Sequence, residues 1–188
     1  MKTDQNQKKY SIVYADPPWQ YNTNECVSKK STLSKTNSEV YPTMRLEDLK
    51  KINVKKIIND KECLLFMWVV SPMLKEGIEL LESWGFSYIT VAFVWYKQRH
   101  SMGHYTLAEC ELCILGKIGK IPTPRGSTNI SQFLSQKRGD HSSKPHEIRK
   151  RIMKMFPSQN KLEMFARGGI MGFLKISNLM DGMYLEIR

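Results

Sequence analysis

Runs of apolar residues alternate along this chain with segments in which apolar positions recur every three or four residues. The run 11–15 (SIVYA) is β-branched and aromatic, which is typical of a strand. The run 63–70 (CLLFMWVV) is apolar throughout, as expected for a strand buried on both faces of a parallel sheet. Further strands are predicted at 86–97, 107–116, 161–166 and 182–188.

Helical spacing of apolar residues is found in segments between these strands. It predicts helices within 45–58, 71–84 and 144–156. The second helix is expected to begin at Ser71 as its N-cap and to end before Gly85. Residues 22–39 are polar and rich in Ser, Thr, Asn and Lys, which predicts a long loop. Strands that alternate with helices predict an α/β fold with a layered sheet, in a single domain over residues 1–188.

Charge is the first property that indicates a partner. The 188 residues include 29 Lys and Arg against 18 Asp and Glu, which gives a net charge of +11. An excess of this size favours a polyanionic partner such as nucleic acid. A lysine-rich surface that serves only solubility explains the same number, and charge alone leaves both open. Basic residues cluster within 50–56, 117–125, 137–138 and 149–154, and some of these clusters must be ordinary solvated helix faces.

Cysteine usage and hydropathy bear on metal binding and location. Cys110 and Cys113 form one C-x-x-C pair, with no second pair nearby. A strand would point these two side chains to opposite faces, so we expect no metal site and interpret the thiols as those of a reducing cytoplasm. No apolar run approaches the ~20 residues of a membrane span. The polar N-terminus lacks the pattern of a signal peptide, so we expect a cytoplasmic location and no membrane partner.

The segment DPPW, directly after the predicted strand at 11–15, is the most informative for chemistry. In open α/β sheets, ligands bind beyond the carboxyl ends of the strands, where this segment lies. Pro17 and Pro18 have no N–H groups, so beside the Asp16 carboxylate the segment offers carbonyl acceptors. Trp19 adds a ring that can stack on a planar group. An acidic strand end followed by a proline turn is the structural alternative, and Trp19 favours the functional one.

Such a set of acceptors suits an aromatic amine with two N–H hydrogens, and the exocyclic nitrogen of adenine is one. Its lone pair is delocalised into the ring, which makes it a poor nucleophile. Hydrogen bonds from its two hydrogens to Asp16 and to the Pro17 carbonyl would favour a tetrahedral nitrogen with a localised lone pair. No strong base is then needed before attack, because positioning and electrostatics carry the step.

Several motifs together resemble one enzyme family, the adenine-N6 methyltransferases typified by the catalytic subunit of the eukaryotic mRNA adenosine methyltransferase and its bacterial and phage relatives. The resemblance begins at Tyr10, covers nearly the whole chain and rests on YADPPW, YPTM, LLFMWVVSP, WGF, FVWYK, GHYTLAECELCILGKIGK, HSSKPHEI and LEMFAR, in this order. It implies a Rossmann-like, S-adenosylmethionine-dependent methyltransferase fold in permuted order. The DPPW strand would come first, and the strand that holds the cofactor, KLEMFAR, would come near the end.

The resemblance also implies a set of site residues and no metal. The catalytic motif would be Asp16, Pro17, Pro18 and Trp19. The pocket for the target base would be lined by Tyr41, Trp95, Glu111 and Lys144. The cofactor would contact Asp16, Pro17, Lys144, Phe165, Arg167 and Asn178. From the pattern alone, Trp95 is equally well explained as core, Glu111 as a solvated edge residue and Lys144 as a helix-entry lysine. An adenine within a duplex must be flipped out to reach such a pocket, and Trp19 or Tyr41 would then stack on it.

We therefore expect transfer of a methyl group to the N6 amine of adenine in nucleic acid. DNA is favoured by the short chain without added RNA-binding modules; RNA methylation and an inactive nucleic-acid-binding subunit are the alternatives. Methylation of a protein amide is disfavoured, because such enzymes typically carry Asn in place of Asp16. A homodimer and a heteromeric partner both stay open. Near the C-terminus, Phe173, Ser177 and Leu179 replace a tryptophan, a glycine and a polar residue of the family pattern, so we expect weak cofactor binding by the free protein.

Overall fold

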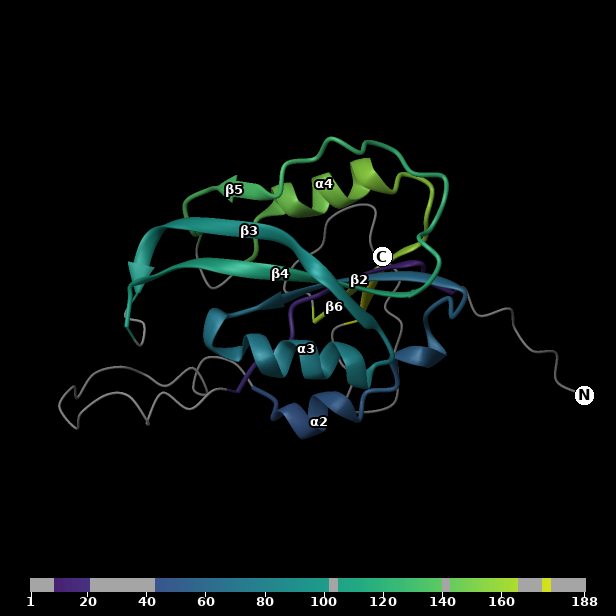
Figure 1. Cartoon of the computed structure of the whole chain (residues 1–188), viewed down its shortest axis with the longest axis horizontal. Coiled ribbons are helices and arrows are strands. Elements are labelled where there is room, and N and C mark those ends of the chain that lie inside the picture. The colour runs from purple at the N-terminus through teal and green to yellow at the C-terminus, as the bar shows by residue number, and fades with distance from the viewer. Residues whose placement is uncertain (1–8, 21–42, 102–104, 140–142, 166–173, 177–188) are drawn as a thin grey trace, which may run out of the picture.

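The computed structural model describes residues 9–20, 43–101, 105–139, 143–165 and 174–176. Within them the chain forms one seven-stranded sheet with helices on both faces, as shown in Figure 1. The strands are β1 (Ile12–Ala15), β2 (Glu62–Val69), β3 (Ser87–Ser101), β4 (Ala108–Gly119), β5 (Phe133–Ser135), β6 (Lys161–Met164) and β7 (Leu174–Ile176). The helices are α2 (Leu46–Lys50), α3 (Leu74–Ser83) and α4 (His146–Met155), with 3₁₀ turns at Val54–Lys56 and Ser71–Met73. The predicted α/β class is confirmed.

The strand order places β1 inside the sheet. The order is β5-β3-β4-β2-β1-β6-β7, and β4 is antiparallel to both of its neighbours while the other pairs are parallel. Ile12 of β1 lies opposite Leu64 of β2 on one side and opposite Lys161 of β6 on the other. From β1 the chain proceeds to β2 and the strands beyond it, and later returns to form β6 on the far side of β1. The carboxyl ends of strands at such a reversal point are where open α/β sheets bind ligands.

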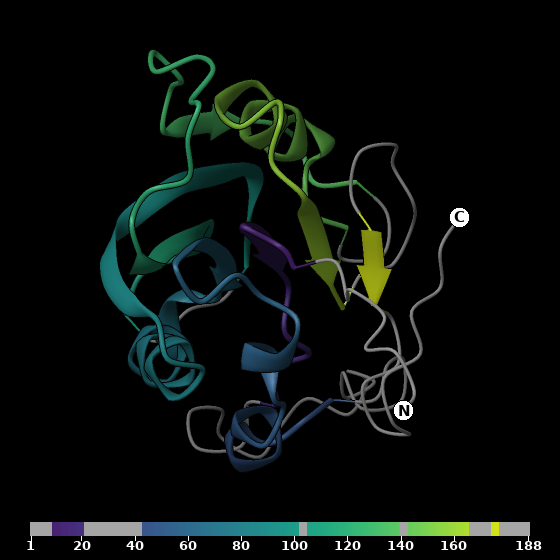
Figure 2. The same cartoon turned by 90° about the vertical axis from the view of Figure 1, so that its right-hand side faces the viewer.

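Two hydrophobic layers enclose the sheet, because successive strand residues point to opposite faces. One layer combines Val13 and Leu65 of the sheet with Leu81 of α3, and the indole N–H of Trp84 donates to the Leu49 carbonyl of α2 at 3.0 Å. The other layer packs sheet residues against α4, and its members are Ile12, Tyr14, Leu64, Phe66, Trp68, Phe93, Trp95, Cys113, Leu134, Ile148, Ile152 and Phe156. Figure 2 shows α4, in yellow-green, across the sheet from the blue and teal helices. DPPW follows a strand that is buried on both faces.

The elements with long, uniform patterns are where the sequence predicts them. Strands β1, β2 and β6 and helix α4 are confirmed within a few residues of their predicted bounds. The segment 45–58 is helical only over Leu46–Lys50 and in one 3₁₀ turn. Its last residues pair with the start of β1 instead: Tyr10 donates its N–H to the Ile57 carbonyl at 3.1 Å, and Asn59 donates to the Tyr10 carbonyl at 2.8 Å. Backbone engaged in this way cannot continue a helix.

Other predicted bounds are corrected by local packing. Ser71 lies in a 3₁₀ turn, so it is not the N-cap of α3, while Gly85 follows that helix with a left-handed φ of 92° as expected. Strand β4 runs through Gly116 to Gly119. Gly116 is needed where α3 approaches, since a Cβ there would lie 2.7 Å from a methyl carbon of Leu81. The three-residue strands β5 and β7 were not predicted. The expected strand at 182–188 and the expected loop at 22–39 lie outside the described residues.

Three of the four cysteines lie within the described residues. Cys113 is fully buried in the layer under α4, Cys110 is half-buried, and both are free, as is the buried Cys63. Across the described residues, no cluster of His, Cys, Asp or Glu is arranged to hold a metal ion. Among the same residues, none of the helices combines the length and the apolar character that a membrane crossing requires.

Close packing of α3 on β2 gives a first testable prediction. A Cβ at Gly77 would lie 2.4 Å from Cγ1 of the buried Val69, whose branched side chain has little freedom to yield. Overpacking lowers the free energy of unfolding by about 1–3 kcal/mol. The higher helix propensity of alanine relative to glycine raises it by about 1 kcal/mol. Because the contact with Val69 would be far shorter than a van der Waals separation, we expect an overpacking cost in the upper half of its range. Gly77→Ala should then lower the free energy of unfolding by about 1–2 kcal/mol in urea titrations at an unchanged m value. Lys75→Ala, exposed on the same helix, is the control; an equally stable Gly77→Ala would contradict the packing argument.

Candidate catalytic site

The chain leaves the sheet at DPPW in a tight, fully bonded turn. Asp16 still donates its backbone N–H to the Met164 carbonyl of β6 at 3.4 Å. The Pro17 carbonyl then accepts from the Trp19 N–H at 2.9 Å, and the Pro18 carbonyl accepts from the Met44 N–H at 2.8 Å. A carbonyl oxygen has two lone pairs, so Pro17 can still accept a bond from a ligand. The turn therefore fixes the Asp16 carboxylate at the carboxyl ends of two adjacent parallel strands.

A lysine ammonium lies between two carboxylates at this point. Nζ of Lys144 is 3.1 Å from Oδ1 of Asp16 and 3.0 Å from Oε2 of Glu111, and only 12% of the Lys144 side chain is exposed. Oε2 of Glu111 is buried and receives no well-oriented hydrogen bond from the described residues, so its contact with Lys144 is ionic. Nζ of Lys97, from β3, lies 3.6 Å from the other Glu111 oxygen. Residues from β1, β3, β4 and the start of α4 thus form one charged cluster.

Mutual attraction keeps this cluster ionised. Burial alone would lower the pKa of Lys144, but Asp16 and Glu111 outweigh it, and its pKa is raised. Burial alone would raise the pKa of Glu111, but Lys144, with smaller contributions from Lys97 and Arg138, lowers that pKa overall. Both groups are charged at neutral pH. Carboxylates that stay ionised in such a sheltered place are strong hydrogen-bond acceptors for an incoming N–H donor.

Tryptophans surround the cluster, and their polar atoms are all engaged. Trp68 lies under the ammonium, with Nζ of Lys144 5.6 Å from its ring centroid. Trp95 meets Trp68 edge-on at 6.2 Å, is 2% exposed, and donates its indole N–H to the Gln136 carbonyl at 2.7 Å. Trp19 is also buried, in the layer on the α3 side, and donates its indole N–H to the Trp68 carbonyl at 3.0 Å. In this structure Trp19 and Trp95 both serve as core, and their contacts with a base stay predictions.

The end of β6 carries an unusual backbone conformation. Phe165, the first residue after the strand, has a left-handed φ of 63°, which non-glycine residues seldom adopt. Such outliers cluster at functional sites, where the surrounding structure holds them in place. Because β1 and β6 are parallel neighbours, Phe165 and Asp16 follow adjacent strands at the same edge of the sheet. The predicted cofactor residue and the predicted catalytic residue therefore meet at the reversal point of the fold.

Known proteins resemble this chain over most of its length. A family model described as MT-A70 matches residues 10–178. The chain belongs to the MT-A70 family. The Type II methyltransferase M.MunI of a Mycoplasma species is 44% identical over 178 residues, which cover 88% of this chain and 76% of that protein.

More distant MT-A70 relatives are much longer than this chain. An N(6)-adenosine-methyltransferase MT-A70-like protein of Arabidopsis thaliana is 26% identical, over 94% of this chain but only 24% of its own length. The N(6)-adenosine-methyltransferase catalytic subunit METTL3 of Homo sapiens is 24% identical, over 94% of this chain and 29% of its own length. The chain thus spans about a quarter of these relatives, and three quarters of M.MunI.

Part of the predicted MT-A70 site can be placed and part cannot. Asp16, Glu111 and Lys144 are brought together, Trp95 lies beside them, and Phe165 follows the adjacent strand. Other site residues or segments named in the sequence analysis lie outside the described residues: Tyr41, Arg167, Phe173, Ser177, Asn178 and Leu179. The expected closing loop at 22–39 lies there too. Their roles stay predictions.

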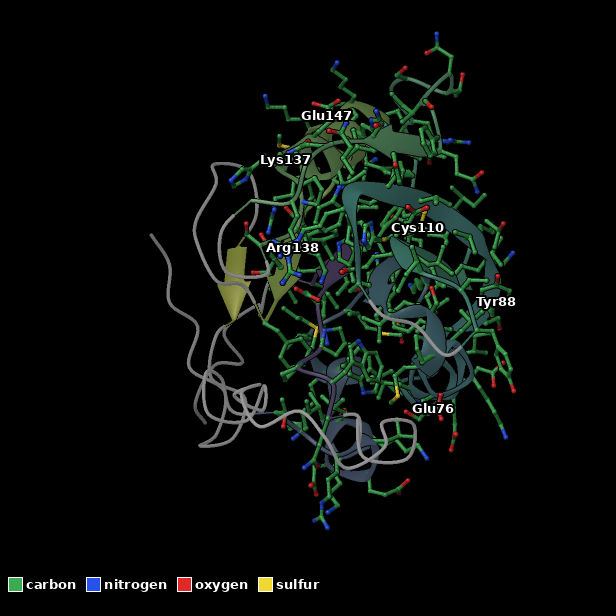
Figure 3. All side chains as sticks on the ribbon, turned by 90° about the vertical axis from the view of Figure 1, so that its left-hand side faces the viewer. Glu76, Tyr88, Cys110, Lys137, Arg138 and Glu147 are labelled. Atoms are coloured by element: carbon green, nitrogen blue, oxygen red, sulfur yellow. The ribbon has the colours of Figure 1, made fainter. Side chains whose placement is uncertain are left out.

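Two basic side chains near the site of this MT-A70 chain were not predicted to lie beside Glu111: Lys97 was not singled out from the sequence, and Arg138 was named only within the basic cluster at 137–138. Lys97 is 7% exposed on β3 and points to Glu111, a role that its place two residues after Trp95 on the same strand face indicates. Arg138, whose charge acts on Glu111, comes from the loop after β5, and its N–H donates to the Lys97 carbonyl at 3.1 Å. Figure 3 shows Lys137 and Arg138 on this loop, between β5 and the end of the sheet that carries β6 and β7. The charge cluster therefore contains more cations than carboxylates.

The lowered pKa of Glu111 gives a prediction about stability. A carboxyl group whose folded pKa is depressed contributes stability above its unfolded pKa, and that contribution is lost as the pH falls through the folded pKa. We expect Glu111→Gln to reduce the free energy of unfolding at neutral pH by about 1–3 kcal/mol, since it leaves buried cations short of a partner. The difference from the parent should shrink as the pH falls below the ordinary glutamate value of 4.5.

Denaturant titrations over a range of pH values measure this difference. Glu109→Gln, an exposed glutamate on the same strand, is the matched control and should show little effect at any pH. A Glu111→Gln difference that grows as the pH falls would contradict the assigned charge state.

Proposed function

We propose that this protein is an S-adenosylmethionine-dependent methyltransferase that modifies the N6 amine of adenine in nucleic acid, with DNA favoured over RNA. The observation that carries the proposal is the pair of ionised carboxylates held around Lys144 at the carboxyl end of β1, in a chain of the MT-A70 family. Asp16 and Glu111 are acceptors that a two-hydrogen amine can use, and the DPPW turn holds the first of them rigidly. The +11 net charge supports a polyanionic substrate.

In this proposal the chain acts on the amine through hydrogen bonds and charge. Asp16 accepts one N–H of the adenine amine, and the second lone pair of the Pro17 carbonyl accepts the other. These bonds orient the nitrogen lone pair away from the ring plane. As the nitrogen attacks it becomes positively charged, and the nearby carboxylates lower the energy of that developing charge. The proton then leaves for water, so no buried general base is required.

The residues present fit the proposed cofactor. When bound, S-adenosylmethionine supplies a methyl group on a positively charged sulfur. Its amino-acid portion has a carboxylate and an ammonium, which match Lys144 and Asp16 in charge, and Phe165 follows the strand adjacent to β1 at the same edge of the sheet. We assign these three residues to cofactor binding, together with Pro17, Arg167 and Asn178.

We extend the proposal to the order of the fold. In a permuted Rossmann-like methyltransferase, β1 is the catalytic strand and β6 is the strand that holds the cofactor. The parallel pairing of β1 with β6, and the left-handed Phe165 directly after β6, support this assignment. Both strands end at the reversal point, where ligands of open α/β sheets bind.

The choice of DNA rests on the pattern of similarity. A protein named as a Type II methyltransferase is 44% identical to this chain, and the match covers 76% of that protein. A protein named as an N(6)-adenosine-methyltransferase is 26% identical, and the match covers only 24% of that protein. RNA methylation is the second candidate. An inactive nucleic-acid-binding subunit is the third, and the charged cluster at DPPW speaks against it, because a pure scaffold has no need of buried carboxylates. A homodimer and a heteromeric partner both remain predictions.

One experiment separates these candidates. The protein is incubated with cofactor carrying an isotopic label on the methyl group, and with duplex DNA, single-stranded DNA and RNA in separate reactions. Nucleosides from each product are then resolved by mass spectrometry. Label in N6-methyldeoxyadenosine supports the proposal, label only in N6-methyladenosine supports the RNA alternative, and label in neither contradicts both. Calorimetry with the cofactor tests the scaffold alternative, since a scaffold should bind none.

The role of Asp16 gives a sharper prediction. We expect Asp16→Ala to retain the fold and to lose about 2–4 kcal/mol of transition-state stabilisation, because the amine loses a charged acceptor. The measurements are kcat/KM for methyl transfer and the melting temperature. Asp60→Ala, which removes an exposed carboxylate after the first helical segment, is the matched control and should be as active as the parent. Parental turnover in a folded Asp16→Ala variant would contradict the assignment.

A further inference from the structure

One arginine of the basic cluster at 149–154 is buried. Arg149 lies within a basic run on α4, yet it is 7% exposed and faces the sheet next to Ile148 and Ile152. Its Nε donates to both carboxylate oxygens of Glu163 on β6, at 3.0 and 3.1 Å, and its Nη2 also pairs with Glu163. Glu163 is itself 2% exposed, so both charges are removed from water.

The same guanidinium makes two further contacts that reach the candidate site. Its Nη1 donates to the backbone carbonyl of Lys144 at 3.3 Å. Its central carbon lies 5.1 Å from the ring centroid of Tyr14 on β1. The Tyr14 hydroxyl in turn accepts the indole N–H of Trp68 at 2.6 Å. Arg149 is thus bonded or stacked to the strand before DPPW, to the strand before Phe165 and to the residue that carries the ammonium.

Fold stability alone does not account for this arrangement. A buried ion pair is weak support for a fold, since apolar residues of similar volume often replace it with no loss of stability. What apolar residues cannot replace is the geometry: a planar guanidinium with donors in a fixed fork can hold a carboxylate and a separate carbonyl at once. Lys144 precedes Pro145 and the first turn of α4, so its backbone has no helical hydrogen bond of its own to fix it.

We propose that Arg149 is a positioning residue: with Glu163 as its anchor on β6, it fixes the backbone of Lys144 so that the ammonium stays between Asp16 and Glu111. The effect that we expect on catalysis rests on the proposed function. The effect that we expect on the position of Lys144 rests on geometry alone. Without the bond to the Lys144 carbonyl, the segment before α4 moves away from β6. The ammonium then loses its fixed distance to the two carboxylates.

The test is a double variant, Arg149→Met/Glu163→Met, that removes both charges and keeps the volume. It is expected to stay folded, because no charge is left unpaired. The first readout is competitive acetylation of the full chain at a fixed, mildly alkaline pH, with Lys144 compared to Lys97 by mass spectrometry. Lys144 should react on the order of threefold faster in the double variant, since an amine released from its ion pairs is more often neutral and exposed. Lys97, whose backbone Arg149 does not contact, should react as in the parent.

The second readout is methyl transfer. A misplaced Lys144 should lower kcat about 10- to 100-fold, with a smaller change in KM for nucleic acid, because positioning acts on the reacting groups. Arg151→Met is the matched control. Arg151 is on the same helix but donates to the carbonyls of Ser131 and Phe133, so its loss should leave the reactivity of Lys144 unchanged. If the double variant fails to fold, Arg149→Lys, which keeps the charge and loses the fork, takes its place with the same expected results.

The two readouts separate the two proposals. An unchanged reactivity of Lys144 in a folded double variant overturns the positioning role, and so does an equal rise in the Arg151→Met control. A parental kcat in the folded double variant also overturns it. If the parent transfers no methyl group to DNA or RNA while the acetylation result holds, the proposed function fails and the positioning role of Arg149 stands.

Discussion

A charged amine removed from water needs opposite charge within a few ångströms, and this requirement organises one end of the molecule. Lys144 has little exposure and is paired with Asp16 and Glu111, which come from β1 and β4. The pairing is favourable only if these strands and the start of α4 hold their separation to within a fraction of an ångström. The hydrophobic layers on both faces supply that rigidity. The described part of the site therefore depends on how the sheet is packed.

The pairing of opposite charges around Lys144 also determines which ligands fit the site. Lys97 and Arg138 bring further positive charge to Glu111, so its carboxylate stays ionised although burial opposes it. A ligand with N–H groups can replace basic side chains as the donor to the carboxylates of Asp16 and Glu111. Each carboxylate then keeps a hydrogen-bond partner. A ligand without donors would leave buried acceptors unsatisfied, which costs about 1–3 kcal/mol for each group. Under the proposed function, this arrangement of charges favours a ligand that carries N–H donors.

Particular elements show how far the sequence could predict this structure. The buried strands and α4 have patterns that run over whole elements, and they were found. β5 and β7 were missed because three residues show no period, and the pairing of β5 also depends on β3, which lies far away in the sequence. The helix expected over 45–58 is short because its last residues pair with Tyr10, a tertiary effect that local spacing does not record.

The candidate site divides in the same way. The chemistry of Asp16 could be argued from its place after a strand, and the convergence of Glu111 and Lys144 on it was expected only through resemblance to a family. Nothing local distinguishes Arg149 from the solvated basic residues around it. Its burial depends on Glu163 across the sheet, and an acidic residue within the apolar run of β6 was the one available signal.

The position of β1 has a consequence for how the protein is made. Ile12 of this four-residue strand pairs with Lys161 of β6, so one of its two partners is synthesised much later than the strand itself. Until then, one edge of an apolar strand is unpaired, and the two halves of the site are on separate parts of an incomplete chain. Pairings between such distant segments form slowly, because the intervening loop must first be closed. The nascent chain therefore cannot bring Asp16 and Phe165 together until β6 has been synthesised and has paired with β1.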